Sequence, residues 1–70
     1  MSYEILANAI VEQAAKDYRW ARTALAKDPE NGSAAQMRSD TERFFRSAWF
    51  GQLTSIDAEW LLQKLEGEFA

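Results

Sequence analysis

Apolar residues recur at steps of three and four in the first part of the chain, the spacing of one helix face. The positions on this stripe are Leu6, Ile10, Ala14, Tyr18 or Ala21, and Leu25. With Ser2 as the N-cap, the pattern predicts a helix over 3–27. Such a helix is roughly 37 Å long. This is long for a domain of 70 residues, so we expect part of its surface to be offered to a second subunit.

The segment 28–33 interrupts this pattern, because Pro29 restricts the residue before it and the Asn31-Gly32 pair favours a turn. Two capping boxes follow, at 33–36 and 39–42. The second helix therefore begins either near Ala34 or near Asp40. We favour one helix over 34–50, with Gly51 supplying a left-handed residue at its C-terminal end.

Thr54 is expected to cap a third helix over 55–66, with Asp57 in its first turn, where a carboxylate suits the helix dipole. The apolar side of this helix consists of Ile56, Trp60, Leu61, Leu62 and Leu65. The short connection between the first two helices predicts that they pack antiparallel. The expected fold class is all-α: a small three-helix domain over 1–70 with a long first helix.

Cysteine and histidine are both absent, which narrows the chemistry open to the chain. Their absence removes disulfides, the usual zinc and copper ligands, and the common nucleophile–base pairs. We therefore expect no enzyme, no metal site and no cofactor. A chain this short buries only roughly 60% of its unfolded surface. Assembly as a homo-oligomer is the expected source of further buried surface.

The net charge of −3 argues against binding to duplex nucleic acid. The third predicted helix carries Lys64 against Asp57, Glu59 and Glu66, so it does not suit a DNA groove. No apolar run approaches the roughly 20 residues that span a membrane, and the N-terminus does not resemble a signal peptide. We expect a cytoplasmic protein.

The basic residues are concentrated in the middle of the chain, interleaved with aromatic residues. On a helical wheel, Phe44, Phe45 and Trp49 share an arc that we assign to the core. Phe50 falls on the other side, beside Arg43 and Arg46. Guanidinium groups bind phosphates and aromatic rings stack on nucleobases. The candidate ligand-binding residues are Tyr18, Arg19, Trp20, Arg22, Arg43, Arg46 and Phe50. The same arginines also suit a solvated or salt-bridged face, or a protein interface.

The stretch Glu42-Arg43-Phe44-Phe45-Arg46-Ser47-x-Trp49-Phe50, then Leu53-Thr54 and Asp57-x-Glu59-x-Leu61-Leu62, resembles small uncharacterised proteins of phages and prophages of gut bacteria. Ala15-Lys16-Asp17-Tyr18-Arg19 and Pro29 are similar to the same group, whose glycine between the Asp and the Glu is Ala58 here. The resemblance implies an accessory protein of a mobile element, a class that often counters host immunity.

Three functions fit the sequence. The leading hypothesis is a homo-oligomer that sequesters a small anionic nucleotide signal. The alternatives are an inhibitor that binds a host defence protein, and a self-associating structural or regulatory module.

Overall fold

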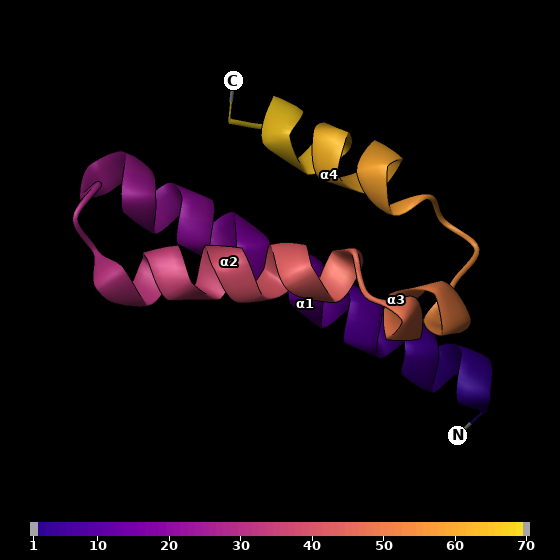
Figure 1. The fold of residues 1–70 in the computed structure, drawn as a ribbon. Coiled ribbons are helices and arrows are strands. Elements are labelled where there is room, and N and C mark those ends of the chain that lie inside the picture. The colour runs from indigo at the N-terminus through magenta and orange to yellow at the C-terminus, as the bar shows by residue number, and fades with distance from the viewer. Residues whose placement is uncertain (1, 70) are drawn as a thin grey trace.

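The computed structural model describes residues 2–69, and within that range the chain forms four helices and no strand. They are α1 (Tyr3–Lys27), α2 (Gly32–Phe45), α3 (Ala48–Leu53) and α4 (Ala58–Gly67) (Figure 1). The expected all-α class is confirmed. The expected number of three helices is wrong, because the second predicted helix is divided into two.

Helix α1 begins and ends where the sequence predicts. The Ser2 hydroxyl accepts a hydrogen bond from the Ile5 amide at 3.2 Å, and the Asp28 amide donates to the Ala24 carbonyl at 2.9 Å. The molecule measures 39 × 22 × 18 Å. The 25 residues of α1 span nearly all of that long dimension by themselves.

Asn31, rather than a serine, caps α2. Its Oδ1 accepts a hydrogen bond from the Ala34 amide at 3.0 Å. The helix therefore begins at Gly32, slightly before the favoured start near Ala34, and continues through Ser39. The alternative start near Asp40 is wrong. Asn31 already has the extended backbone of a cap as the chain leaves the Pro29 turn, so both capping boxes fall inside the helix.

Helix α2 ends at Phe45 and does not reach Phe50, because Ser47 caps a new helix. The Ser47 hydroxyl donates to the Phe44 carbonyl at 2.6 Å and accepts from the Phe50 amide at 3.2 Å. The predicted continuous helix over 34–50 is therefore wrong. Gly51 lies inside α3, and none of the described glycines has a positive φ, so the predicted left-handed residue is wrong as well.

Asp57, rather than Thr54, caps α4. Its Oδ1 accepts hydrogen bonds from the amides of Glu59 at 2.9 Å and Trp60 at 3.4 Å. Thr54 ends α3 instead, and its hydroxyl accepts from the Ile56 amide at 3.2 Å. A carboxylate satisfies two donors and carries the charge that suits a helix N-terminus. The third predicted helix therefore begins at Ala58 and not at Ser55.

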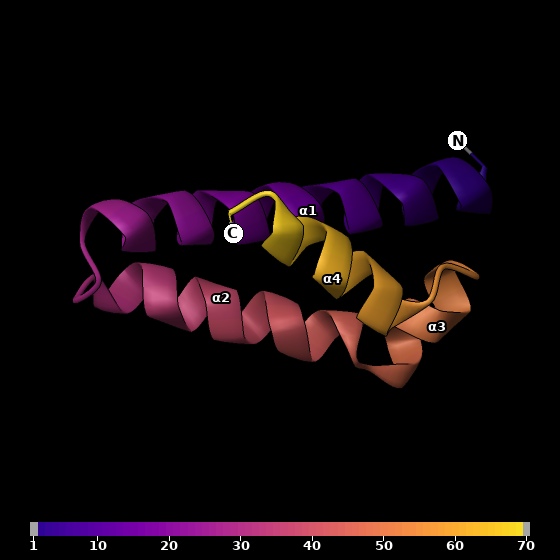
Figure 2. The ribbon, with the colours of Figure 1, turned by 90° about the horizontal axis from the view of Figure 1, so that it is seen from above.

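Helices α1 and α2 pack side by side and antiparallel, as their short connection predicts (Figure 2). We call this pair the α1–α2 hairpin. Helix α4 lies across one face of the hairpin, and α3 rests beside the N-terminal part of α1 (Figure 1). There the Tyr3 hydroxyl donates to the Gln52 carbonyl at 3.2 Å. No helix of residues 2–69 covers the opposite face of the hairpin.

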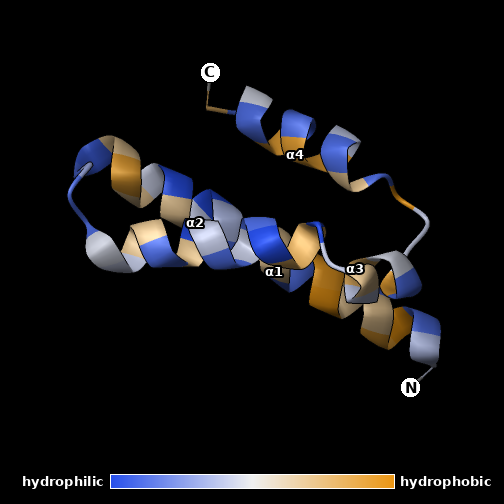
Figure 3. Ribbon diagram, in the orientation of Figure 1, coloured by the Kyte–Doolittle hydropathy of each residue, from blue (hydrophilic) through white to orange (hydrophobic). Residues whose placement is uncertain are grey.

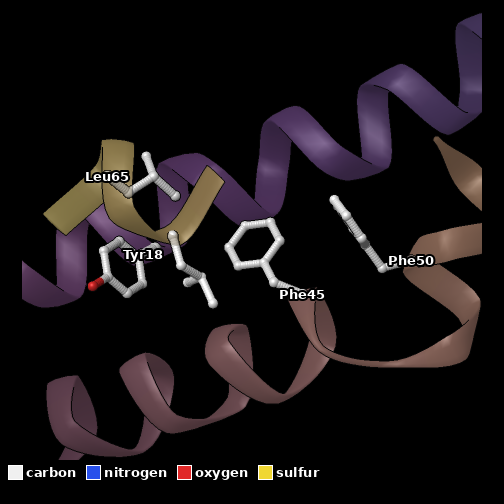
Figure 4. Close-up of a cluster of buried hydrophobic side chains, with 5 residues drawn as sticks. Tyr18, Phe45, Phe50 and Leu65 are labelled. Carbon is white, nitrogen blue, oxygen red and sulfur yellow. The ribbon is translucent and has the colours of Figure 1, made fainter. Parts of the chain in front are cut away.

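The core lies between the hairpin and α4. Its buried side chains are Tyr18, Phe45, Phe50, Leu62 and Leu65 (Figure 4). The rings of Phe45 and Phe50 meet edge to face with centroids 5.5 Å apart, a favoured geometry for aromatic pairs. Figure 3 shows that α4 turns its apolar side toward the hairpin and its polar side outward.

Candidate functional site

The two candidate arginines of α1 contact the acidic end of α4. Arg19 donates to Glu68 from Nε at 2.8 Å and from Nη2 at 3.1 Å, which is a bidentate pair. Arg22 forms an ion pair with Glu66, and its guanidinium lies 5.3 Å from the ring centroid of Phe69. Both groups that were predicted to hold phosphates therefore hold carboxylates of the same chain.

Glu66 is the centre of a polar network that joins three helices. Tyr18 donates its hydroxyl to Glu66, and the same hydroxyl accepts from Nη1 of Arg22 at 3.2 Å. Arg38 of α2 donates to Glu66 at 3.3 Å and to Glu42 at 2.9 Å. The hydrogen bond from Arg22, followed by that from Tyr18, lowers the pKa of Glu66. Burial raises the pKa of Tyr18. This network holds α4 on the hairpin, which gives Tyr18 and Arg22 a structural role.

Arg43 and Arg46, expected on one face, differ in their surroundings. Arg46 lies between Glu59, at 3.0 Å, and Glu42, at 3.5 Å. The Arg43 side chain is 75% exposed, and its ion pair within residues 2–69 is a long contact of 3.9 Å with Asp40. Three of the four candidate arginines are thus engaged by carboxylates at 3.0 Å or less, and Arg43 is the least engaged.

The exposed aromatic side chains are Tyr3 and the three tryptophans. Tyr18 is fully buried and Phe50 is 2% exposed. The expectation that Phe50 stands on a basic face is therefore wrong, because the break between α2 and α3 turns its ring into the core. Trp49, which was expected in the core, is 52% exposed, while Trp20 is 51% and Trp60 53% exposed. Of the candidate stacking rings, only Trp20 is accessible.

An open groove of about 340 Å³ lies between α1 and α2. Its apolar lining consists of Ile10, Ala14, Met37, Phe44 and Trp49, and its polar rim of Gln13, Asp17, Asp40 and Thr41. On α1, Ile10 and Asp17 are about 100° or more around the helix axis from Val11 and Ala15. The latter two lie in the cleft on the α4 side together with Leu61. The groove therefore lies on the face of the hairpin that α4 does not cover.

Sequence reasoning missed this groove although its residues carried a signal. Ile10 and Ala14 belong to the apolar stripe of α1. Met37, Phe44 and Trp49 share one arc of the second predicted helix. Both stripes were expected to lie in the core, and the two do face each other across the hairpin. A single short helix, α4, covers one side only, so part of each stripe stays in solvent.

No group of three or more acidic side chains in residues 2–69 is placed to hold a metal ion. None of the helices described is both long and apolar enough to cross a membrane. Tyr18 and Glu66, whose pKa values are both shifted, belong to the contact that fixes α4.

Comparison with known proteins identifies no relative: no family model, curated protein or solved structure matches the chain. The resemblance to phage and prophage proteins therefore stays a prediction.

Proposed function

We propose that the protein is a non-catalytic helical binding module that docks against another protein through the open groove of the α1–α2 hairpin. The observation that carries this proposal is the exposure of Trp49, whose ring is 52% exposed at the edge of an apolar groove. Tryptophan is enriched among the residues that dominate binding energy in protein interfaces. Leaving such a ring in water forgoes the large gain that burying it provides.

The chemistry of the groove suits a protein better than a small anion. Ile10, Met37 and Phe44 present apolar side chains, and the carboxylates of Asp17 and Asp40 stand at the rim. An apolar centre with a polar rim is the usual anatomy of a protein interface. A phosphate group would meet two negative charges here and one cation, Arg43, nearby.

The resemblance to accessory proteins of mobile elements supplies a biological context for this docking. In that context the module blocks a host defence protein, or regulates a process of the mobile element, without chemistry of its own. The absence of cysteine and histidine fits a protein that works by contact alone.

Site-specific photo-crosslinking tests the proposal in cells that produce the protein. A benzophenone amino acid replaces Trp49 in one variant and Trp60 in the control, because the two rings are equally exposed, 52% and 53%, on opposite sides of the hairpin. We expect a cross-linked product of discrete mass from position 49 only. Equal products from both positions, or none from position 49, would contradict docking through the groove.

Sequestration of a small anionic nucleotide is a second candidate function, favoured by one observation. Arg43, Ser47 and Trp49 line a shallow hollow of about 360 Å³ together with Asp40 and Phe44. Arg43 is the candidate arginine with the most exposed side chain, and Trp49 offers a ring on which a base could stack. Before they could bind a phosphate, Arg19, Arg22 and Arg46 would each have to break an ion pair with a carboxylate.

Native mass spectrometry of protein purified from phage-infected, immune-competent cells tests this second candidate. Retained nucleotide that disappears in Arg43→Glu but not in Arg19→Glu would support the hollow beside Trp49 as its site. Protein that carries no small molecule would count against sequestration and leave docking by the groove as the function.

A further inference from the structure

We infer that the groove of the α1–α2 hairpin binds a basic amphipathic helix of a partner protein. The apolar side of that helix fills the groove, and its lysine or arginine side chains reach Asp17 and Asp40. This inference rests on the proposed docking function and names the chemistry of the partner. Two features of the molecule support it: the way in which α4 binds the other face of the hairpin, and the charges that the groove presents.

Helix α4 shows which kind of helix binds the covered face of this hairpin. Its side chains Leu62 and Leu65 are buried against the hairpin. Beside them, Glu66 binds Arg22 of α1 and, at 3.3 Å, Arg38 of α2. The covered face of the hairpin is therefore basic on both of its helices, and the helix that covers it is apolar in the middle and acidic at its edge.

The groove on the uncovered face presents the opposite charge. None of the described residues that line it is basic, and each helix contributes one carboxylate, Asp17 from α1 and Asp40 from α2. Both carboxylates accept hydrogen bonds from neutral glutamine amides, at 2.9 Å and 2.8 Å. Their ion pairing within residues 2–69 is limited to the 3.9 Å contact of Asp40 with Arg43. A helix with lysine or arginine on both flanks therefore complements the groove.

The form of the groove also suits a helix. It lies between two antiparallel helices, where the side-chain ridge of a third helix can pack. Its apolar residues recur at helical steps on both walls, with Ile10 and Ala14 on α1 and Met37 and Phe44 on α2. The exposed Trp49 ring packs edge to face on Phe44, with centroids 5.5 Å apart. Amphipathic helices bind such grooves through apolar side chains at i, i+3, i+4 and i+7.

A second copy of the chain fits this site less well than a basic helix of another protein. The chain carries a net charge of −3, and four of its arginines already bind carboxylates of the same chain: Arg19, Arg22, Arg38 and Arg46. Helix α4 is acidic at its edge, and its apolar side is already buried. A partner rich in lysine or arginine is instead attracted to an acidic protein over a distance, which raises the rate of association.

Fluorescence anisotropy with synthetic peptides tests the chemistry of the partner. The probe is a labelled helix of about 15 residues, or roughly 22 Å, with leucine at i, i+3, i+4 and i+7 and lysine on both flanks. The matched probe has glutamate in place of each lysine. We expect the basic probe to bind about 10-fold more tightly, because each exposed charge pair contributes a factor of about 2 to 5. Equal affinities, tighter binding of the acidic probe, or no binding of either would overturn the inference.

Charge reversal in the protein assigns the binding to the groove. In the double variant Asp17→Lys, Asp40→Lys, the acidic probe should bind more tightly than the basic one. The matched control is Glu12→Lys, Glu30→Lys, which changes the net charge equally at exposed residues that do not line the groove. The control should still prefer the basic probe. A preference lost equally in both variants would show a response to net charge alone and would overturn the inference. Circular dichroism verifies that both variants are folded.

The fluorescence of Trp49 reports directly on occupation of the groove. With Trp20 and Trp60 replaced by phenylalanine, Trp49 is the only tryptophan, and the basic probe should reduce its quenching by acrylamide. The matched protein that retains only Trp60 should show no such reduction. Protection of Trp60 in place of Trp49 would put the probe on the other face of the hairpin and overturn the inference.

Photo-crosslinking at position 49 separates this inference from the proposed function. Mass spectrometry of the product identifies the segment of the partner that lies in the groove, and a basic amphipathic helix there would support both. A segment that is acidic or not helical, or that belongs to a second copy of the chain, would overturn the basic helix and leave docking through the groove intact. The absence of any product from position 49 would remove both.

Discussion

Tyr18 on α1 donates its hydroxyl to Glu66 on α4, 48 residues later in the chain. The contact joins the buried end of a core tyrosine to a carboxylate that also binds Arg22 and Arg38. It lies in the last turn of α4, where it holds the C-terminal end of this helix on the hairpin. Several measurable properties of the molecule depend on it.

Glu66→Gln should lower the free energy of unfolding by about 1–2 kcal/mol, because Tyr18, Arg22 and Arg38 lose a charged acceptor. The loss should not exceed this range, because the Glu66 side chain is 43% exposed and solvent screens its ion pairs. Urea denaturation followed by circular dichroism measures the loss. Glu68→Gln is the matched control, as Glu68 is 44% exposed but pairs with Arg19 alone. An equal loss in the two variants would contradict the central role of Glu66.

Acid should destabilise the protein through the same carboxylates. Arg22 lowers the pKa of Glu66, and Arg19 lowers the pKa of Glu68. A carboxylate with a lowered pKa contributes stability above its ordinary pKa of 4.5 and loses it as the pH falls through the lowered value. We therefore expect the unfolding free energy to fall as the pH decreases from 4.5, and to fall less in Glu66→Gln. Parallel curves for the two proteins would show that Glu66 is not responsible.

High pH should destabilise the protein by ionising the hydroxyl of Tyr18. Burial, followed by the hydrogen bond to Glu66, raises the pKa of Tyr18 above 10.0. A group with a raised pKa stabilises the fold while it is protonated, so its contribution is complete below 10.0 and is lost as the pH rises through the raised value. Ultraviolet absorbance of tyrosinate in Tyr3→Phe, where Tyr18 is the only tyrosine, measures this titration. In urea the same group should titrate at lower pH; identical titrations in the folded and unfolded protein would refute the shift.

Phe45→Ala should cost roughly 3–5 kcal/mol, because it removes a large ring from a fully buried site. This loss approaches the entire stability expected of a small domain, so the variant should be largely unfolded at room temperature. Phe45 has no exposed surface. Trp20→Ala, at a site that is 51% exposed, should leave the unfolding midpoint nearly unchanged. Thermal denaturation of the two variants distinguishes a core ring from a surface ring.

Ser47→Ala should destabilise the protein by about 1 kcal/mol, the usual cost of losing an N-cap. The hydroxyl bonds both to the Phe44 carbonyl and to the Phe50 amide, so it holds the junction between α2 and α3. Ser39→Ala is the control, because Ser39 lies inside α2, where alanine favours the helix. Urea midpoints that change equally in both variants would contradict the assigned caps.

Local patterns in the sequence determined the helical class, the full extent of α1 and the antiparallel hairpin. The reason is that each depends on neighbours in the chain: the Ser2 cap, a stripe repeated every three to four residues, and a turn at Pro29. The burial of Phe45 was likewise predicted from its place on the apolar arc of the second predicted helix.

The ends of the later helices were decided by competition between nearby caps, which the pattern alone does not rank. Asn31, and not Ser33, caps α2. Ser47 caps α3 and so ends the helix that the apolar pattern extends to Phe50. Asp57, and not Thr54, caps α4. The division at Ser47 then exchanges the surroundings of two rings, so that Phe50 enters the core and Trp49 faces solvent.

The sequence by itself determined which side chains are basic, acidic or apolar, and which of them share a face of one helix. Only the tertiary structure decided which faces meet. The acidic end of α4 comes to rest on Arg19, Arg22 and Arg38, so groups that were available to a ligand are neutralised within the chain. Helix α4 covers one face of the hairpin and leaves the apolar groove on the other face exposed. Burial and ion pairing are properties of elements distant in sequence, and for that reason the groove beside Trp49 becomes visible only when the helices are assembled.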